Sequence, residues 1–234
     1  MAILDVVKGA ATVLGLDVPN QVYGATTREM VEMQDLANVM AAEIVDAYDW
    51  QKLLIYYTIT GDGVASDFDI PSDYKRMQKT SSMWSSRWLW QTMHLTGPDQ
   101  WTELQVTPIA TVNGYWIIFG DQFHQWPVMA NGETVKFFYV SNLIVKASDN
   151  STKTSFTEDA DSFRLSERLL KLAIIYRWKQ NKGQAYEQWF DDYQTLLLRD
   201  IDKDPGSKAV ISGAPPVSWR GRGIAWPGTV TGAP

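Results

Sequence analysis

The amino-acid sequence predicts an α+β fold with a helical core, a β-rich insertion and an extended C-terminal arm. Apolar residues between Ser166 and Asp202 recur at helical spacing on both sides of Gly183, which is typical of two amphipathic helices forming a hairpin. In the middle of the chain the spacing changes to short β-prone runs separated by turn residues. After Asp204 the chain is rich in proline and glycine. These observations divide it into an N-terminal helical part (1–53), a β-rich insertion (54–148), the hairpin that completes the helical core (149–204) and the arm (205–234).

Two helices are predicted in the N-terminal part. Apolar residues at helical spacing predict the first over Ile3 to Leu14, followed by Gly15 as a stop signal. A longer helix is predicted over Thr27 to Tyr48, with Thr26 and Glu29 spaced as a capping box. Its methionine-rich face is interpreted as a core face that packs against the later hairpin, rather than as a binding groove.

The insertion combines strands with one short helix. Tyr57 to Thr60 and Phe68 to Pro71 are predicted to be two strands around the tight connection Gly61-Asp62-Gly63. A short helix is expected from Pro98 to Leu104, because Thr96, Pro98 and Asp99 are helix start signals. Further strands are predicted over Tyr115 to Phe119, Phe123 to Trp126 and Val135 to Val140.

Tryptophan is unusually frequent, with eleven in 234 residues, and three of these lie close together in the insertion. Alternation along a strand would place Trp88 and Trp90 on the same face. Trp84, Trp88 and Trp90 could therefore form a subunit or tail interface, because aromatic residues are enriched at protein interfaces. The alternative, that they cover the core of their own sheet, remains open at this point.

The hairpin and the segment before it contain recognisable boundaries. Ser166 and Glu167 suit a helix start, and Gly183 can adopt the left-handed conformation that ends a helix. The polar segment from Asp149 to Asp161 is predicted to be a loop that returns the chain to the hairpin.

The last thirty residues have a composition unsuited to a core. They hold five of the ten prolines, six of the sixteen glycines and three basic residues, but no acidic residue. They also contain spaced apolar residues, unlike an inert linker. We interpret them as an arm that becomes ordered on a partner.

Composition and motifs argue against several function classes. A net charge of −6 argues against nonspecific binding to a phosphate backbone, and the absence of cysteine excludes thiolate metal sites and thiol nucleophiles. No apolar run is long enough to span a bilayer and no signal-like start is present, so a soluble, unsecreted protein is expected. His94 and His124 lack neighbouring acids at metal-ligand spacing, and Pro205 interrupts the calcium-loop pattern that begins at Asp200. No catalytic, cofactor-binding or metal-binding residue is predicted.

Several short motifs in a fixed order resemble those of the head-to-tail adaptor, or connector, proteins of tailed bacteriophages. The resemblance covers about residues 1–205, and the region from Lys75 to Pro108 matches no usable pattern. Ser166 stands where such proteins often have proline, and either residue suits a helix start. The motifs are Asp49-Trp50-Gln51, residues 58–63, residues 68–74, Tyr139-Val140-Ser141, residues 163–170, Arg177-Trp178-Lys179 and Lys182-Gly183.

The resemblance implies a structural virion protein without enzymatic activity. Such an adaptor, assembled in the host cytoplasm, would form a ring of twelve copies beneath the portal protein, in the neck of the virion. The ring would extend the DNA channel and present a surface to a downstream tail or nozzle protein. An acidic chain suits a channel through which DNA passes without sequence-specific binding.

In this setting the C-terminal arm is expected to dock on the portal protein. Trp219 and Trp226 would serve as apolar anchors, and Arg220 and Arg222 would pair with portal acids. The full set of expected docking residues is Val210, Ile211, Trp219, Arg220, Arg222, Ile224 and Trp226. The alternative function is a carbohydrate-binding module or a receptor-binding protein associated with a tail fibre, because tryptophan faces stack well on sugars.

Overall fold

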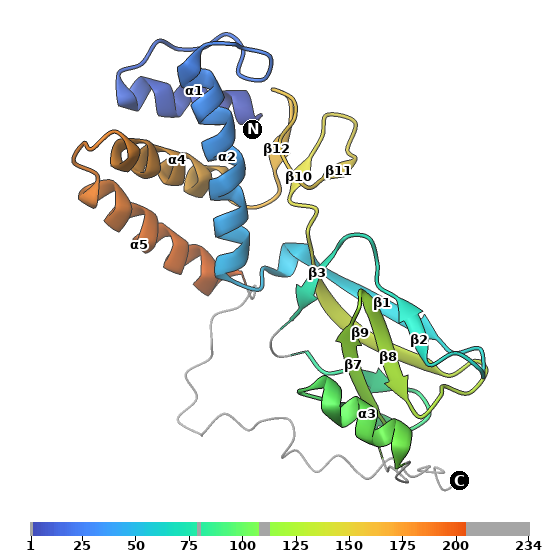
Figure 1. Cartoon of the computed structure of the whole chain (residues 1–234). Coiled ribbons are helices and arrows are strands. Elements are labelled where there is room, and N and C mark those ends of the chain that lie inside the picture. Colours follow the sequence, from blue (N-terminus) through green and yellow to red (C-terminus); the bar gives the residue numbers. More distant parts are fainter. Residues whose placement is uncertain (1, 79–80, 108–112, 205–234) are drawn as a thin grey trace, which may run out of the picture. The chain divides into compact units, whose positions relative to one another are not determined.

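The computed structural model describes residues 2–78, 81–107 and 113–204, and its mixed helices and sheets confirm the predicted α+β class (Figure 1). The helices of the described residues are α1 (Ile3–Leu14), α2 (Arg28–Ala47), α3 (Pro98–Val106), α4 (Glu167–Asn181) and α5 (Glu187–Lys203), with a 3-10 turn, η1 (Gln51–Leu53). The strands are β1 (Leu54–Thr60), β2 (Asp67–Asp69), β3 (Tyr74–Met77), β4 (Trp84–Ser85), β5 (Trp90–Gln91), β6 (Met93–His94), β7 (Tyr115–Phe119), β8 (Gln122–Trp126), β9 (Thr134–Ser141), β10 (Val145–Lys146), β11 (Thr152–Lys153) and β12 (Ser162–Phe163).

The described chain forms two compact units, each built from separate stretches of sequence. The first, here called the helical unit, comprises residues 2–57, 70–78, 81 and 137–204. The second, the strand unit, comprises residues 58–69, 82–107 and 113–136. The chain passes from one unit to the other within β1, between residues 69 and 70, between residues 81 and 82, and within β9.

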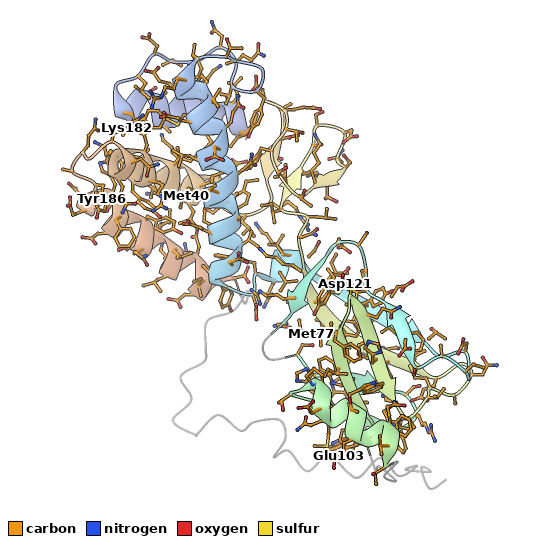
Figure 2. The ribbon with its side chains drawn as sticks, in the orientation of Figure 1. Met40, Met77, Glu103, Asp121, Lys182 and Tyr186 are labelled. Carbon is orange, nitrogen blue, oxygen red and sulfur yellow. The ribbon has the colours of Figure 1, made fainter. Side chains whose placement is uncertain are left out.

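In the helical unit, α4 packs against α1, α2 and α5. Met30, Met33 and Met40 of α2 are buried in the same apolar cluster as Leu169 and Ile174 of α4, and Figure 2 labels Met40 on α2. The methionine-rich face is therefore a core face, as predicted. Burial of large apolar side chains of this kind contributes roughly 1.5–3 kcal/mol each.

The predicted capping box at the start of α2 is wrong. The N-cap residue is Thr27, whose side chain makes no capping hydrogen bond, and the helix begins at Arg28. Because the start lies one residue later than expected, Glu29 becomes the second helical residue instead of the third. The reciprocal arrangement with Thr26 requires the third position.

The α4–α5 hairpin has the boundaries expected from the sequence. The Leu169 N–H donates to the Ser166 hydroxyl at 3.4 Å, which caps α4. Gly183 has a φ of +65°, and the Gln184 N–H donates to the Lys179 carbonyl at 2.9 Å, so the chain leaves α4 through a left-handed turn. At the far end of the hairpin, the Asp204 carboxylate accepts a hydrogen bond from the Gln51 N–H at 2.7 Å.

The predicted loop before α4 contains a buried carboxylate that the sequence did not reveal. The fully buried Asp161 accepts hydrogen bonds from the Thr157 and Glu158 N–H groups at 2.8 and 3.0 Å, and its other oxygen lies 3.1 Å from Lys153 Nζ. Burial acts to raise the pKa of Asp161, but these donors outweigh it and lower the pKa below its usual range. The Ile3 N–H donates to the Asp161 carbonyl at 2.7 Å, so this loop is fastened to the start of α1.

Three sheets are present among the described residues: β1-β9-β4-β5 with β3 also on β9, β2-β8-β7-β6, and β11-β10-β12. The first two strands, predicted around a tight connection, do not pair with each other: β1 pairs with β9, whereas β2 pairs with β8. Gly61 continues the β1 pairing, donating to the Glu133 carbonyl at 2.8 Å and accepting from the Gly132 N–H at 3.0 Å. The Asp62 carboxylate then accepts from the Val64 and Ala65 N–H groups, and this local turn redirects the chain away from β1.

Candidate assembly surfaces

A short hairpin in the strand unit carries exposed tryptophans. We call residues 84–91 the tryptophan hairpin; in it β4 and β5 pair so that Trp84 lies opposite Gln91 and Ser85 opposite Trp90. Trp84 and Trp90 are 47% and 52% exposed, and their ring centroids lie 6.5 Å apart. These two side chains therefore form a solvent-facing apolar surface in the described chain.

The expected alternation of Trp88 with Trp90 along one strand is wrong. Residues 86–89 form the turn between β4 and β5, so Trp88 is not a strand residue. It is half-buried, with the Arg87 guanidinium 4.6 Å from its ring centroid. Next to it, Leu89 is 58% exposed and has a φ of +50°, a left-handed conformation that costs a leucine roughly 1–2 kcal/mol.

A buried hydrogen-bond network holds the base of the tryptophan hairpin. The Ser85 hydroxyl donates to the Glu133 carboxylate at 2.8 Å, and the Ala130 N–H donates to the other Glu133 oxygen at 2.9 Å. The Ser86 N–H also donates to the Thr134 carbonyl at 2.9 Å. Because these contacts fix the backbone below the turn, the exposed apolar side chains are presented from a defined base.

The helical unit has a pocket of about 300 Å³ at the connected end of the α4–α5 hairpin. Tyr186, near this connection, is labelled in Figure 2. Tyr176 packs edge-on against Phe190, with ring centroids 5.4 Å apart, and burial raises the pKa of the Tyr176 hydroxyl. The pocket is lined by Tyr176, Arg177, Gln180, Tyr186, Glu187, Phe190 and Asp191.

The lining of the α4–α5 pocket combines aromatic rings with carboxylates at its rim. Phe190 is 36% exposed, and Glu187 and Asp191 are exposed beside it on α5. Arg177 is already engaged, because its guanidinium donates to the Gln180 side-chain oxygen at 2.8 Å. Chemically, such a pocket suits an apolar or aromatic side chain that is accompanied by a cation.

His124 is a buried polar residue whose partner could not be read from local spacing. Its Nδ1 lies 2.6 Å from the Asp67 carboxylate, and its Nε2 lies 3.2 Å from the Phe119 carbonyl oxygen. The hydrogen bond with His124 is the largest effect that lowers the pKa of Asp67. Asp67 and His124 are 57 residues apart in sequence but directly opposite across β2 and β8, so only the strand pairing brings them together.

The geometry of His124 is that of a structural residue. Its ring stacks on Phe119 at 3.8 Å with an interplanar angle of 12°, whereas His94 is exposed beside Trp116. Within the described ranges, no group of three or more histidine, cysteine or acidic residues is arranged to hold a metal ion.

The other expected docking residues cannot be placed. The described residues end at Asp204 and so do not include Val210, Ile211, Trp219, Arg220, Arg222, Ile224 or Trp226.

Among the helices of the described part of the chain, none is long and apolar enough to cross a membrane.

Comparison with known proteins bears on the role of these surfaces. No curated protein matches the chain. The model of the family described as SU10 adaptor protein matches residues 1–217, which is most of the 234-residue sequence. The match confirms the resemblance to bacteriophage head-to-tail adaptors, and it supports a structural role in the virion neck over a catalytic one. The chain therefore belongs to the SU10 adaptor protein family.

Proposed function

We propose that this protein is the head-to-tail adaptor of a tailed bacteriophage, and that twelve copies form a ring docked on the portal protein. The ring extends the DNA channel and attaches the downstream tail or nozzle protein. The observation that carries the proposal is the match of the adaptor family model to residues 1–217.

Two properties of the chain support the proposal. A net charge of −6 suits a channel wall, because DNA would slide past it without the counterion release that drives binding to basic surfaces. The exposed rings of Trp84 and Trp90 supply the aromatic contact area that protein interfaces use. Both properties suit a protein that works between partners.

The segment 205–234 is proposed to be the portal-docking arm. It carries Lys208, Arg220 and Arg222 without any acidic residue, together with Trp219 and Trp226. Arginine pairs with carboxylates in bidentate fashion, and tryptophan fills apolar pockets at interfaces. The portal surface that receives the arm would therefore be acidic with apolar hollows.

Native mass spectrometry of the full chain mixed with its portal protein tests the proposal. The portal ring is expected to gain a fixed number of adaptor copies, one for each portal subunit. A variant that lacks residues 206–234 is expected to keep the circular dichroism of the helical unit and to lose this binding. If the full chain never binds the portal ring, the adaptor function is refuted; if the truncated chain binds equally well, the arm has a different role.

A further inference from the structure

We infer that copies of this protein bind one another head to tail, with the tryptophan hairpin of one copy occupying the α4–α5 pocket of the next. The inference deepens the proposed function, on which it rests, by naming the contact that would build the ring. It concerns two surfaces that lie in different units of the chain, and it requires no rearrangement within either unit.

The tryptophan hairpin has the chemistry of an inserting element. Trp84, Leu89 and Trp90 are each about half exposed, and the left-handed conformation of Leu89 is a local strain at the tip of the turn. Such strain persists only where the surrounding structure imposes it, and it is found mainly at functional positions. The Ser85–Glu133 hydrogen bond at the base fixes the turn, so little ordering would be needed on binding.

The α4–α5 pocket has the chemistry of the matching receptor. Its aromatic lining offers edges and faces to an indole or isobutyl group, and its volume of about 300 Å³ is in the range of small-molecule and side-chain pockets. Hot-spot tryptophans in protein interfaces typically fill pockets that lose their water when the partner binds.

The charges around the two surfaces are complementary. The tryptophan hairpin is flanked by the exposed Lys136, which lies opposite Trp84 on β9, and by Arg87 in its turn, whose guanidinium lies 3.9 Å from the Glu133 carboxylate. The α4–α5 pocket has Glu187 and Asp191 in its rim, with Asp192 exposed next to them, while the lining cation Arg177 is hydrogen-bonded to Gln180. Opposite charges around a common apolar centre favour one partner and one orientation.

The combination of two different surfaces determines the type of assembly. When a patch on one copy fits a pocket elsewhere on an identical copy, the contact is heterologous and repeats until it closes into a ring or extends into a filament. Binding of a second copy therefore explains both the tryptophan hairpin and the α4–α5 pocket. A tail protein bound to the tryptophan hairpin would leave the α4–α5 pocket without a role.

Disulfide cross-linking provides the test, because the chain has no cysteine. Leu89→Cys in one population and Gln180→Cys in another are mixed under mild oxidation, alone and on the portal ring. Disulfides between the two variants are expected, and the double variant should give a ladder of oligomers. Gln105→Cys on exposed α3, paired with Gln180→Cys, is the matched control and should give background yield.

Trp90→Ser provides an independent measurement without cysteines. Loss of one hot-spot tryptophan is expected to weaken self-association by about tenfold to a hundredfold in sedimentation equilibrium, whereas Gln105→Ser should leave it unchanged. If portal rings gain adaptor copies but no disulfide forms between the cysteines at positions 89 and 180, this inference is overturned and the proposed function stands. If the chain gives disulfide-linked ladders but never binds the portal ring, the proposed function is refuted and the head-to-tail contact stands. Cross-links formed only within single chains would also overturn the head-to-tail contact.

Discussion

The helical unit and the strand unit are stabilised by different kinds of interaction. In the helical unit one apolar cluster joins α1, α2, α4 and α5, and Asp161 is a fully buried polar residue of the same unit. In the strand unit a small cluster of Leu95, Leu104 and Ile117 is surrounded by partly buried aromatic rings. The strand unit also contains specific polar pairs, such as His124 with Asp67 and Ser85 with Glu133.

This difference teaches how one chain can be both stable and available to partners. Apolar burial is non-directional and grows with area, so a helical unit with a large core tolerates variation at its surface. Hydrogen-bonded pairs fix geometry at a few points and leave other side chains free. The strand unit can thus keep large aromatic side chains exposed while its turns stay in place. Substitutions in each unit measure how much its buried polar contacts contribute to stability.

The largest effect is expected for Asp161→Ala in the helical unit. Removing this carboxylate leaves two N–H groups without an acceptor and Lys153 paired only with Glu158, which should cost about 2–4 kcal/mol in the free energy of unfolding. Urea denaturation followed by circular dichroism measures it. Asp149→Ala, at an exposed turn, is the control and should cost less than about 1 kcal/mol. Equal effects at the two positions would contradict the assigned role of Asp161.

The same carboxylate makes the stability of the helical unit sensitive to acid. The pKa of Asp161 in the folded protein lies below its value in the unfolded chain, so the unfolded chain binds the proton more tightly. The stabilisation is therefore fully present above the unfolded pKa of about 4 and is lost as the pH falls through the folded pKa. The midpoint urea concentration should decline below about pH 4 in the natural protein and decline less steeply in Asp161→Ala.

A smaller effect is expected for His124→Phe in the strand unit. The substitution keeps an aromatic ring on Phe119 but removes both hydrogen bonds, which should cost about 1–3 kcal/mol. The pKa of Asp67 should also rise towards its ordinary value, which side-chain carboxyl NMR during an acid titration can detect. His94→Phe is the matched control, and both quantities should stay unchanged there. An unaltered Asp67 titration in His124→Phe would show that the two side chains do not interact.

The smallest effects concern the starts of two helices in the helical unit. Ser166→Ala removes the cap of α4 and should lower the free energy of unfolding by about 0.5–1 kcal/mol. Thr27→Ala should change it by only a few tenths of a kcal/mol, because Thr27 makes no capping hydrogen bond. Thermal unfolding of the two variants side by side checks the ranking. A greater loss at Thr27 would restore the idea that the start of α2 is capped by a side chain.

The sequence predicted the regular elements well and the contacts between distant segments poorly. Helical periodicity gave α1 at its observed bounds, and the left-handed turn at Gly183 was predicted because few residues other than glycine adopt it. Local signals also located β7, β8 and β9 closely. The pairing of β2 with β8, and hence the Asp67–His124 contact, depends on tertiary structure that no local pattern encodes.

The candidate surfaces were predicted only in part. Aromatic clustering pointed to Trp84 and Trp90, whose exposed rings make an interface possible, but alternation failed for Trp88 because a four-residue turn interrupts the strand. The α4–α5 pocket was missed, because residues of both α4 and α5 line it and no single stretch of sequence shows that. The buried Asp161 looked like an ordinary loop residue, since its donors come from backbone groups.

The hydrogen bond from Gln51 to Asp204 determines how the molecule would bear a mechanical pull. Asp204 is the residue after α5, and Gln51 begins the short turn that leads into β1. Tension on the chain beyond Asp204 would act on the end of α5 and, through this bond, on the start of η1. The bond stabilises the last turn of α5, since unfolding of this helix from its C-terminus must first break it. A force applied through the C-terminal segment would thus be shared between the end of α5 and the start of η1.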